Sequence, residues 1–108
     1  MEKENLLINI IETQNLTLLK DFAKENPEFS FDFTTEKGRN LLHYAASKLS
    51  SNTLAIIQII LEKGVDPLDV DEKFISPLDV AKDNNNIPAL TLMKHYINKK
   101  NQENKSYL

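Results

Sequence analysis

The sequence contains an internal repeat, and this repeat limits the folds that the chain can adopt. A shift of 36 residues aligns residues 40–45, Asn-Leu-Leu-His-Tyr-Ala, with residues 76–81, Ser-Pro-Leu-Asp-Val-Ala. Leu7 and Ile10 lie 35 residues before the matching positions of the first of these segments, which brings a third copy into the same frame. Periods of about 20–50 residues are typical of solenoids, in which neighbouring repeats bury each other's apolar faces.

Apolar residues also recur at helical spacing in six short blocks. Pairs at i, i+1 followed by i+4, i+5 put one apolar stripe on one helix face, as a buried amphipathic helix requires. The blocks span residues 6–11, 16–23, 41–46, 56–61, 78–81 and 90–97. Because a short connection makes consecutive helices antiparallel neighbours, the sequence predicts an all-α solenoid of three antiparallel helix pairs.

The residues that flank the blocks favour the same division. Asn15, Asn40 and Ser76 stand immediately before helical runs, where a short polar side chain accepts from free backbone N–H groups. Pro77 follows Ser76 at the first helical position, which needs no N–H donor. Gly64 is placed to end the fourth helix in the left-handed conformation.

Small residues recur where the first helices of successive pairs should meet. Ala45, Ala46 and Ala81 occupy matching positions in the second and third copies. Since packed helices lie roughly 8–10 Å apart, we expect these alanines to permit close stacking.

The linkers between the pairs are longer than the connections within them. Residues 29–33 alternate between phenylalanine and polar residues, residues 65–70 read as extended, and a polar turn follows each segment. These patterns indicate short hairpin-like loops, too short for an independent sheet.

A chain of 108 residues has room for one compact domain. We expect it over residues 1–100, and residues 101–108 are expected to form a polar, flexible tail. The three repeats are expected at about residues 2–33, 34–70 and 71–99.

The motifs resemble those of ankyrin-repeat proteins. Residues 38–46, Gly-Arg-Asn-Leu-Leu-His-Tyr-Ala-Ala, look like the family's G-x-T-P-L-H-x-A-A segment, and residues 57–66 look like its V-x-x-L-L-x-x-G-A-D segment. A weaker copy covers residues 71–96, and residues 2–33 look like a degenerate N-terminal capping repeat. The resemblance implies an ankyrin-like solenoid that recognises other proteins through its hairpin tips and inner helices.

The sequence departs from the family pattern in several places, and the motif threonine is replaced by Asn40 in one copy and Ser76 in the next. The motif histidine is retained as His43 but replaced by Asp79 in the next copy. Residues 48–53, between the helices of the middle pair, are about three residues longer than the family pattern. Phe74 stands where the family has the hairpin glycine, so a left-handed residue there would be strained.

The residue types give catalysis little support, and we expect no enzymatic activity, cofactor or metal. The chain has no cysteine, and its two histidines, His43 and His95, lie in different repeats. The resemblance implies a structural hydrogen bond for His43, and His95 is expected to face solvent. Two glycines are too few for a phosphate-binding loop. A net charge of −3 argues against nucleic acid, and no apolar run approaches the roughly 20 residues of a membrane span.

The family's binding positions, carried over one by one, give a candidate surface. At the tips they are Glu36, Lys37, Arg39, Glu72, Lys73, Phe74 and Ile75, and on the inner helices Ser47, Lys48, Asp83 and Asn84. Arg39 is the only arginine, a residue type enriched in interface hot spots. For Phe74 two alternatives remain: exposure at the tip, or packing against residues 29–33.

The leading hypothesis is a protein–protein interaction module, an adaptor or inhibitor, with an unidentified protein partner. The alternative is a structural or regulatory unit that self-associates or docks onto a larger assembly. The first predicts a monomer and the second at least a weak homodimer. A cytoplasmic location is expected, in the cell of origin or in a host cell if the protein is a secreted effector. The end of the chain, Ser106-Tyr107-Leu108, also fits a PDZ-type ligand.

Overall fold

A computed structural model describes residues 2–105, and these residues form six α-helices without a β-strand. The all-helical class predicted from the apolar spacing is therefore confirmed. The radius of gyration is 13.6 Å, close to the ~13 Å expected of a compact domain of about 100 residues. The helices are α1 (Glu2–Glu12), α2 (Leu16–Glu25), α3 (Leu41–Ala46), α4 (Thr53–Glu62), α5 (Pro77–Asp83) and α6 (Ile87–Lys105).

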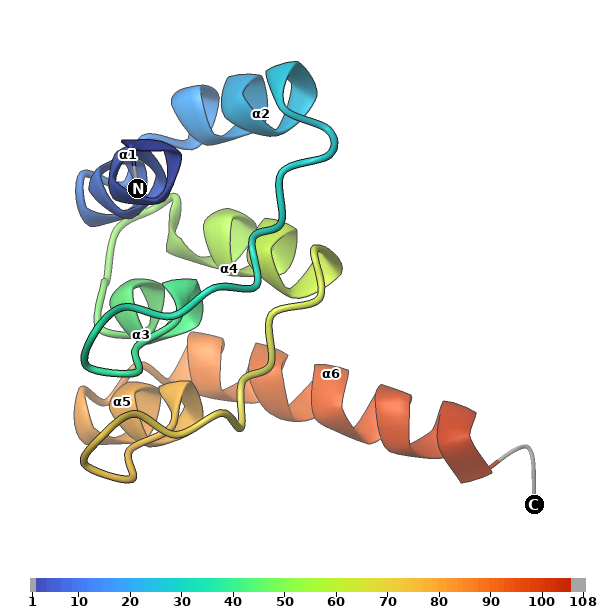
Figure 1. Cartoon of the computed structure of the whole chain (residues 1–108). Helices are drawn as coiled ribbons and strands as arrows, with labels where there is room; N and C mark the ends of the chain where they lie inside the picture. The colour runs from blue at the N-terminus through green and yellow to red at the C-terminus, as the bar shows by residue number, and fades with distance from the viewer. Residues whose placement is uncertain (1, 106–108) are drawn as a thin grey trace.

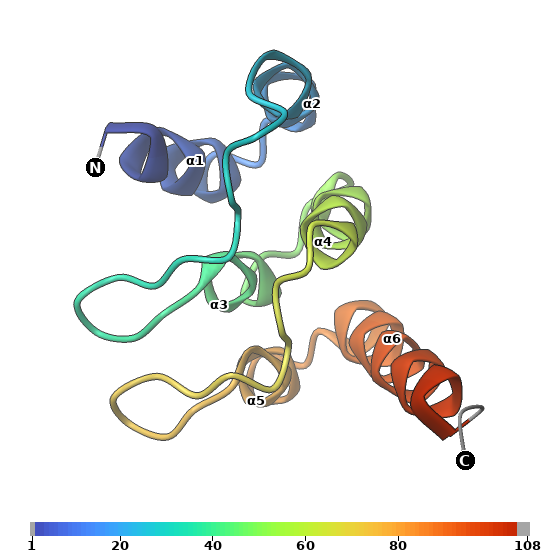
Figure 2. The ribbon, with the colours of Figure 1, turned by 45° about the vertical axis from the view of Figure 1, so that its right-hand side comes forward.

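The helices are arranged in two neighbouring columns. Helices α1, α3 and α5 lie one below another, and α2, α4 and α6 form the second column beside them (Figure 1). Each helix of the first column, α1, α3 or α5, contacts the helix that follows it in the sequence. The loops before α3 and α5 project from the same side of the molecule, one below the other (Figure 2). We call these projections the first tip, residues 34–39, and the second tip, residues 71–75.

One apolar core extends through both columns, from Leu7 in α1 to Met93 in α6. Ala45 and Ala46 in α3 and Ala81 in α5 are completely buried. Helix α3 contacts both α1 and α5, so small side chains at these positions allow the first column to stack closely. The expectation drawn from the alanines is confirmed.

The predicted helix starts are confirmed, and they explain one departure from the family pattern. The Asn40 side chain accepts a hydrogen bond from the His43 backbone, and the His43 ring accepts one in return from the Asn40 N–H. Ser76 and Asp79 make the same reciprocal pair at the start of α5. Histidine and aspartate are thus equivalent at the third helical position, because each side chain accepts a hydrogen bond from the capping residue's N–H.

The last helix continues beyond the boundary expected from the sequence. Residue 101 was expected to begin a flexible tail, but α6 runs to Lys105. Gln102 and Glu103 are good helix formers, and adding them to an existing helix requires no new nucleation. The remaining part of the expected tail, residues 106–108, lies outside the described residues.

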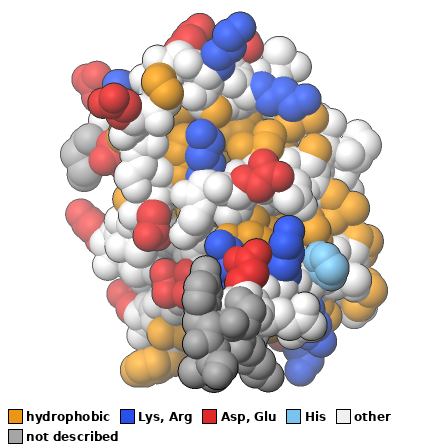
Figure 3. Space-filling model, turned by 90° about the vertical axis from the view of Figure 1, so that its right-hand side faces the viewer, with side chains coloured by type: hydrophobic (Ala, Val, Ile, Leu, Met, Phe, Trp, Pro, Cys, Tyr) orange, Lys and Arg blue, Asp and Glu red, His pale blue; other side chains and the backbone are white. Residues whose placement is uncertain are grey.

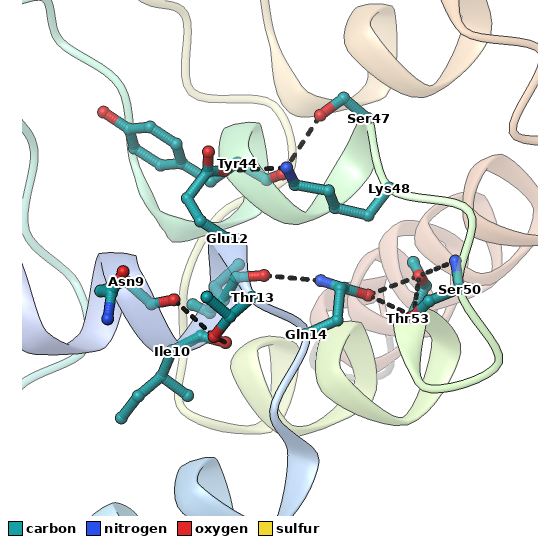
Figure 4. A network of polar contacts seen from close by, with 11 residues as sticks. Asn9, Ile10, Glu12, Thr13, Gln14, Tyr44, Ser47, Lys48, Ser50 and Thr53 are labelled. Atoms are coloured by element: carbon teal, nitrogen blue, oxygen red, sulfur yellow. Dashed lines mark hydrogen bonds and ion pairs between the residues drawn. The ribbon is translucent and has the colours of Figure 1, made fainter.

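The connection between α3 and α4, residues 47–52, contacts the turn after α1 (Figure 4) and the turn before α6. Gln14, in the turn after α1, accepts hydrogen bonds from the hydroxyls of Ser50 at 2.8 Å and Thr53 at 2.6 Å. On the other side, the buried Asn86 amide donates to the carbonyls of Ala46 and Lys48. The additional residues are therefore held between the turns of the first and third pairs.

Candidate protein-binding surface

The two tips are built in the same way. In the first, the Thr35 N–H donates to the Arg39 carbonyl and the Gly38 N–H donates to the Thr35 carbonyl, both at 2.9 Å. In the second, the Asp71 N–H donates to the Ile75 carbonyl and the Phe74 N–H donates to the Asp71 carbonyl, again at 2.9 Å. Gly38 has a φ of 77° and Phe74 a φ of 62°, so both turns place a left-handed residue at the same position.

The tips are also joined to each other. The Glu72 N–H donates to the Lys37 carbonyl at 2.9 Å, and His43 Nε2 donates to the Ile75 carbonyl at 2.8 Å. His43 therefore connects α3 to the following turn, and the structural hydrogen bond predicted for it is confirmed. Two backbone segments far apart in the sequence are fixed side by side.

Gly38 is favoured over other residues not only by its positive φ but also by the close approach of the second tip. A Cβ atom on Gly38 would lie 3.3 Å from both the Asp71 Cα and the Glu72 nitrogen. The second tip has no third tip below it among the described residues (Figure 2). Phe74 therefore has room for a side chain, although its φ of 62° disfavours any residue that carries a Cβ.

Phe74 is 82% exposed. Of the two alternatives left by the sequence, packing against residues 29–33 is therefore wrong. Those residues have another partner, since Phe29 and Phe31 make edge-on contacts with Phe22, with ring centroids 5.7 and 6.1 Å apart. The aromatic segment of the linker closes over the first helix pair and leaves the second tip uncovered.

The structure brings some of the predicted binding residues together and separates others. Lys37, Arg39, Glu72, Lys73 and Ile75 line one groove of about 270 Å³ between the tips, which we call the inter-tip groove. The remaining predicted residues lie outside it, namely Glu36, Ser47, Lys48, Phe74, Asp83 and Asn84.

Outside the inter-tip groove, most of the predicted residues are exposed and one is held by a neighbour. Glu36, Ser47, Asp83 and Asn84 are exposed, as predicted for binding positions. Lys48 is half-buried and forms an ion pair with Glu12 at 3.4 Å. Lys48 therefore contributes to the contact between α1 and the loop after α3, a role that the sequence did not suggest.

A second groove was not foreseen from the sequence. It has a volume of about 530 Å³ and lies between the first two turns of α1 and the first tip, and we call it the α1 groove. Ile8, Phe33 and Tyr44 supply its apolar surface, and Lys37 and Arg39 line it as they line the inter-tip groove. No local sequence signal places α1 beside the first tip, because that contact depends on how the helices stack.

Arg39 lies at the junction of the two grooves. Its guanidinium carbon is 4.9 Å from the centroid of the Tyr44 ring, a cation–π contact. The side chain donates no hydrogen bond to any described residue, and its Nε atom is buried without an acceptor. The stacking on Tyr44 therefore holds the guanidinium in place without a hydrogen bond to any described residue.

His43 is fully buried, and its ring nitrogens are both engaged. Since Nδ1 accepts from the Asn40 N–H, the proton resides on Nε2, which donates to the Ile75 carbonyl. Burial lowers the pKa of His43 and outweighs the opposing effect of the Ile75 carbonyl. The ring is neutral and structural. His95 is exposed on α6, as expected.

Two further observations concern the described residues as a whole. They contain no group of three or more histidine, cysteine or acidic side chains placed to hold a metal ion. None of their helices is both long and apolar enough to cross a membrane. On the face shown in Figure 3, hydrophobic side chains alternate with intermingled lysines and acids, so this face carries no patch of a single charge.

No known protein-family model matches the chain, and a search of curated proteins found no match.

Proposed function

We propose that the chain is an ankyrin-like solenoid of three antiparallel helix pairs that binds another protein through its hairpin tips and inner-helix face. In this proposal the first pair is a degenerate N-terminal cap. The protein acts as an adaptor or inhibitor in a cytosol, either its own or that of a host. It has no enzymatic activity and needs no cofactor, nucleic acid or membrane.

The arrangement of the repeats supports the fold assigned here. The matching segments 40–45 and 76–81 begin helices α3 and α5, which contact each other within one column. The tips that precede them share their hydrogen-bond pattern and are linked through Lys37, Glu72 and His43. A shared unit that stacks on its copies is the physical basis of a solenoid.

The observation that carries the function is the exposure of Phe74. A phenylalanine that is 82% exposed, on a strained backbone, contributes little to the stability of the free protein. Burying it in a partner would remove apolar surface from water, worth about 1.5–3 kcal/mol for a whole side chain. Aromatic anchors of this kind commonly supply much of the energy of an interface.

Affinity capture with three immobilised baits tests the proposal: the wild type, Phe74→Gly and Leu49→Ala. Leu49 is the matched control, because it is 71% exposed in the loop between α3 and α4 and lies away from both tips. Bound proteins are quantified by mass spectrometry after capture from candidate lysates. We expect at least one protein to be retained by the wild type and Leu49→Ala and depleted at least tenfold on Phe74→Gly. Identical profiles on all three baits would refute binding through the second tip.

Self-association is the second candidate, and a separate surface favours it. An apolar groove of about 690 Å³ lies between α4 and α6, with Leu54 and Ile87 exposed along it. Sedimentation velocity at micromolar concentration separates the two candidates. A monomer supports the adaptor proposal, whereas a dimer that Leu54→Glu dissociates would support the second candidate.

A further inference from the structure

The two grooves are arranged as a path for an extended chain. The α1 groove and the inter-tip groove share Lys37 and Arg39, so a segment that passes from one to the other must cross these two cations. In Figure 2 the first tip lies below α1 and above the second tip, and all three lie on the same side of the molecule. Most residues that line the two grooves belong to these segments. Their volumes, about 530 and 270 Å³, are large enough to hold side chains of a peptide.

Arg39 is prepared for an anionic ligand. Its guanidinium is held against Tyr44, so little side-chain freedom remains to be lost on binding. The buried Nε–H is already shielded from water and has no acceptor among the described residues. Part of the desolvation cost of an interaction at this side chain is therefore already present in the free protein.

The surroundings of Arg39 select among anions. Glu36 and Glu72 lie on the two tips, Glu4 lines the α1 groove, and Asp71 lines the inter-tip groove together with Arg39. These carboxylates disfavour a polyanion such as a nucleic acid, whereas a single carboxylate meets Arg39 and Lys37 at short range. The apolar wall of the α1 groove adds a contact for an aliphatic or aromatic side chain.

We propose that the two grooves bind an extended segment of the partner protein, with a single aspartate or glutamate on Arg39 and an apolar residue two positions away in the α1 groove. A spacing of two places both side chains on the same side of an extended chain, about 6.6–6.8 Å apart. The carboxylate accepts from the guanidinium in the bidentate geometry that arginine favours. This inference rests on the proposed function and specifies the chemistry of the partner.

Selection from a library of phage-displayed random dodecapeptides tests this inference. The baits are the wild type, Arg39→Gln, Arg39→Lys, Phe74→Gly and, as a matched control, Lys100→Gln. Lys100 also lies over a tyrosine ring, that of Tyr96 at 5.6 Å, but it lines neither groove. We expect wild type and Lys100→Gln to enrich peptides that carry an acid two positions from an apolar residue, and Arg39→Gln to lose this enrichment.

Fluorescence anisotropy with a labelled consensus peptide then measures the contact. Replacing the peptide's acid by its amide, or Arg39 by glutamine, should weaken binding about 10- to 100-fold, the range of charge-assisted hydrogen bonds. Arg39→Lys should recover part of the loss, because lysine keeps the charge without the bidentate geometry. The melting temperature of Arg39→Gln should fall by no more than about 5 °C, since the variant loses the cation–π contact with Tyr44 but no hydrogen bond to the described residues.

Three results would overturn the inference. The first is a selection in which the wild type does not enrich peptides that carry an acidic residue. The second is enrichment of the same peptides by the wild type and by Arg39→Gln. The third is N-acetylglutamate competing as well as the peptide, which would show that a free carboxylate suffices. If the selected peptides depend on Phe74 but not on Arg39, the tip-binding proposal stands and the groove inference fails. Peptides that depend on neither residue would refute both.

Discussion

Replacing Phe74 by glycine measures the strain at the second tip. Phe74 has a φ of 62°, and the left-handed conformation costs a residue with a Cβ about 1–2 kcal/mol. Glycine avoids this cost but loses roughly 0.5–1 kcal/mol of backbone entropy on folding. Little burial is lost, because the ring is 82% exposed. We therefore expect Phe74→Gly to stabilise the protein by about 0.5–1 kcal/mol.

The matched variant is Phe74→Ala, which removes the ring but keeps the Cβ. Because the strained backbone remains and the ring contributes little burial, its stability should lie within about 0.5 kcal/mol of wild type. Urea unfolding followed by circular dichroism gives the free energies, and thermal melting should show a rise of about 4 °C for the glycine variant.

A loss of 1 kcal/mol or more in both variants would refute this reasoning. Such a loss would mean that the Phe74 ring packs against the protein and is not free at the tip. Equal stability of the glycine and alanine variants, with no gain over wild type, would show that the left-handed turn carries no strain. In either case, the stability argument for Phe74 as a binding residue would fail.

Three further perturbations address the interior. Gly38→Ala should lose about 2 kcal/mol or more in urea unfolding, because a Cβ there adds left-handed strain and lies 3.3 Å from the second tip's backbone. Asn86→Ala should lose about 1–3 kcal/mol in the same assay, since it leaves the Ala46 carbonyl without this donor. Lowering the pH below about 6.5 should reduce stability: the folded pKa of His43 is lowered, so the unfolded chain takes up the proton first. This pH dependence should disappear in His43→Gln and persist in His95→Gln, and its persistence in His43→Gln would contradict the assignment.

Local features of the sequence predicted the helices and their starts. Asn15, Asn40 and Ser76 cap helices as expected, and Gly64 takes the left-handed conformation after α4. These residues act within three or four positions along the chain, so their effects are visible in a short window of sequence. The end of α6 was misplaced, because a polar composition does not by itself stop an existing helix.

The binding surface was only partly predictable, because it depends on contacts between residues that are far apart in the sequence. The tip positions could be named from the family resemblance, but the exposure of Phe74 depends on there being no third tip beneath it among residues 2–105. The α1 groove brings Ile8 to the same site as Arg39 and Tyr44, which are more than thirty residues away in the sequence. Such juxtapositions follow from helix stacking, and a single sequence contains no local signal for them.

The hydrogen bonds of residues 47–52 bear on how the chain unfolds. In a repeat array, the free energy of contact between neighbouring units decides whether the ends open separately or the whole array melts together. Gln14 accepts from Ser50 and Asn86 donates to Lys48, so opening the helices at either end breaks polar contacts with this segment. Native-state hydrogen exchange should therefore find similar opening free energies for α1 and α5, with the six described helices behaving as one cooperative unit.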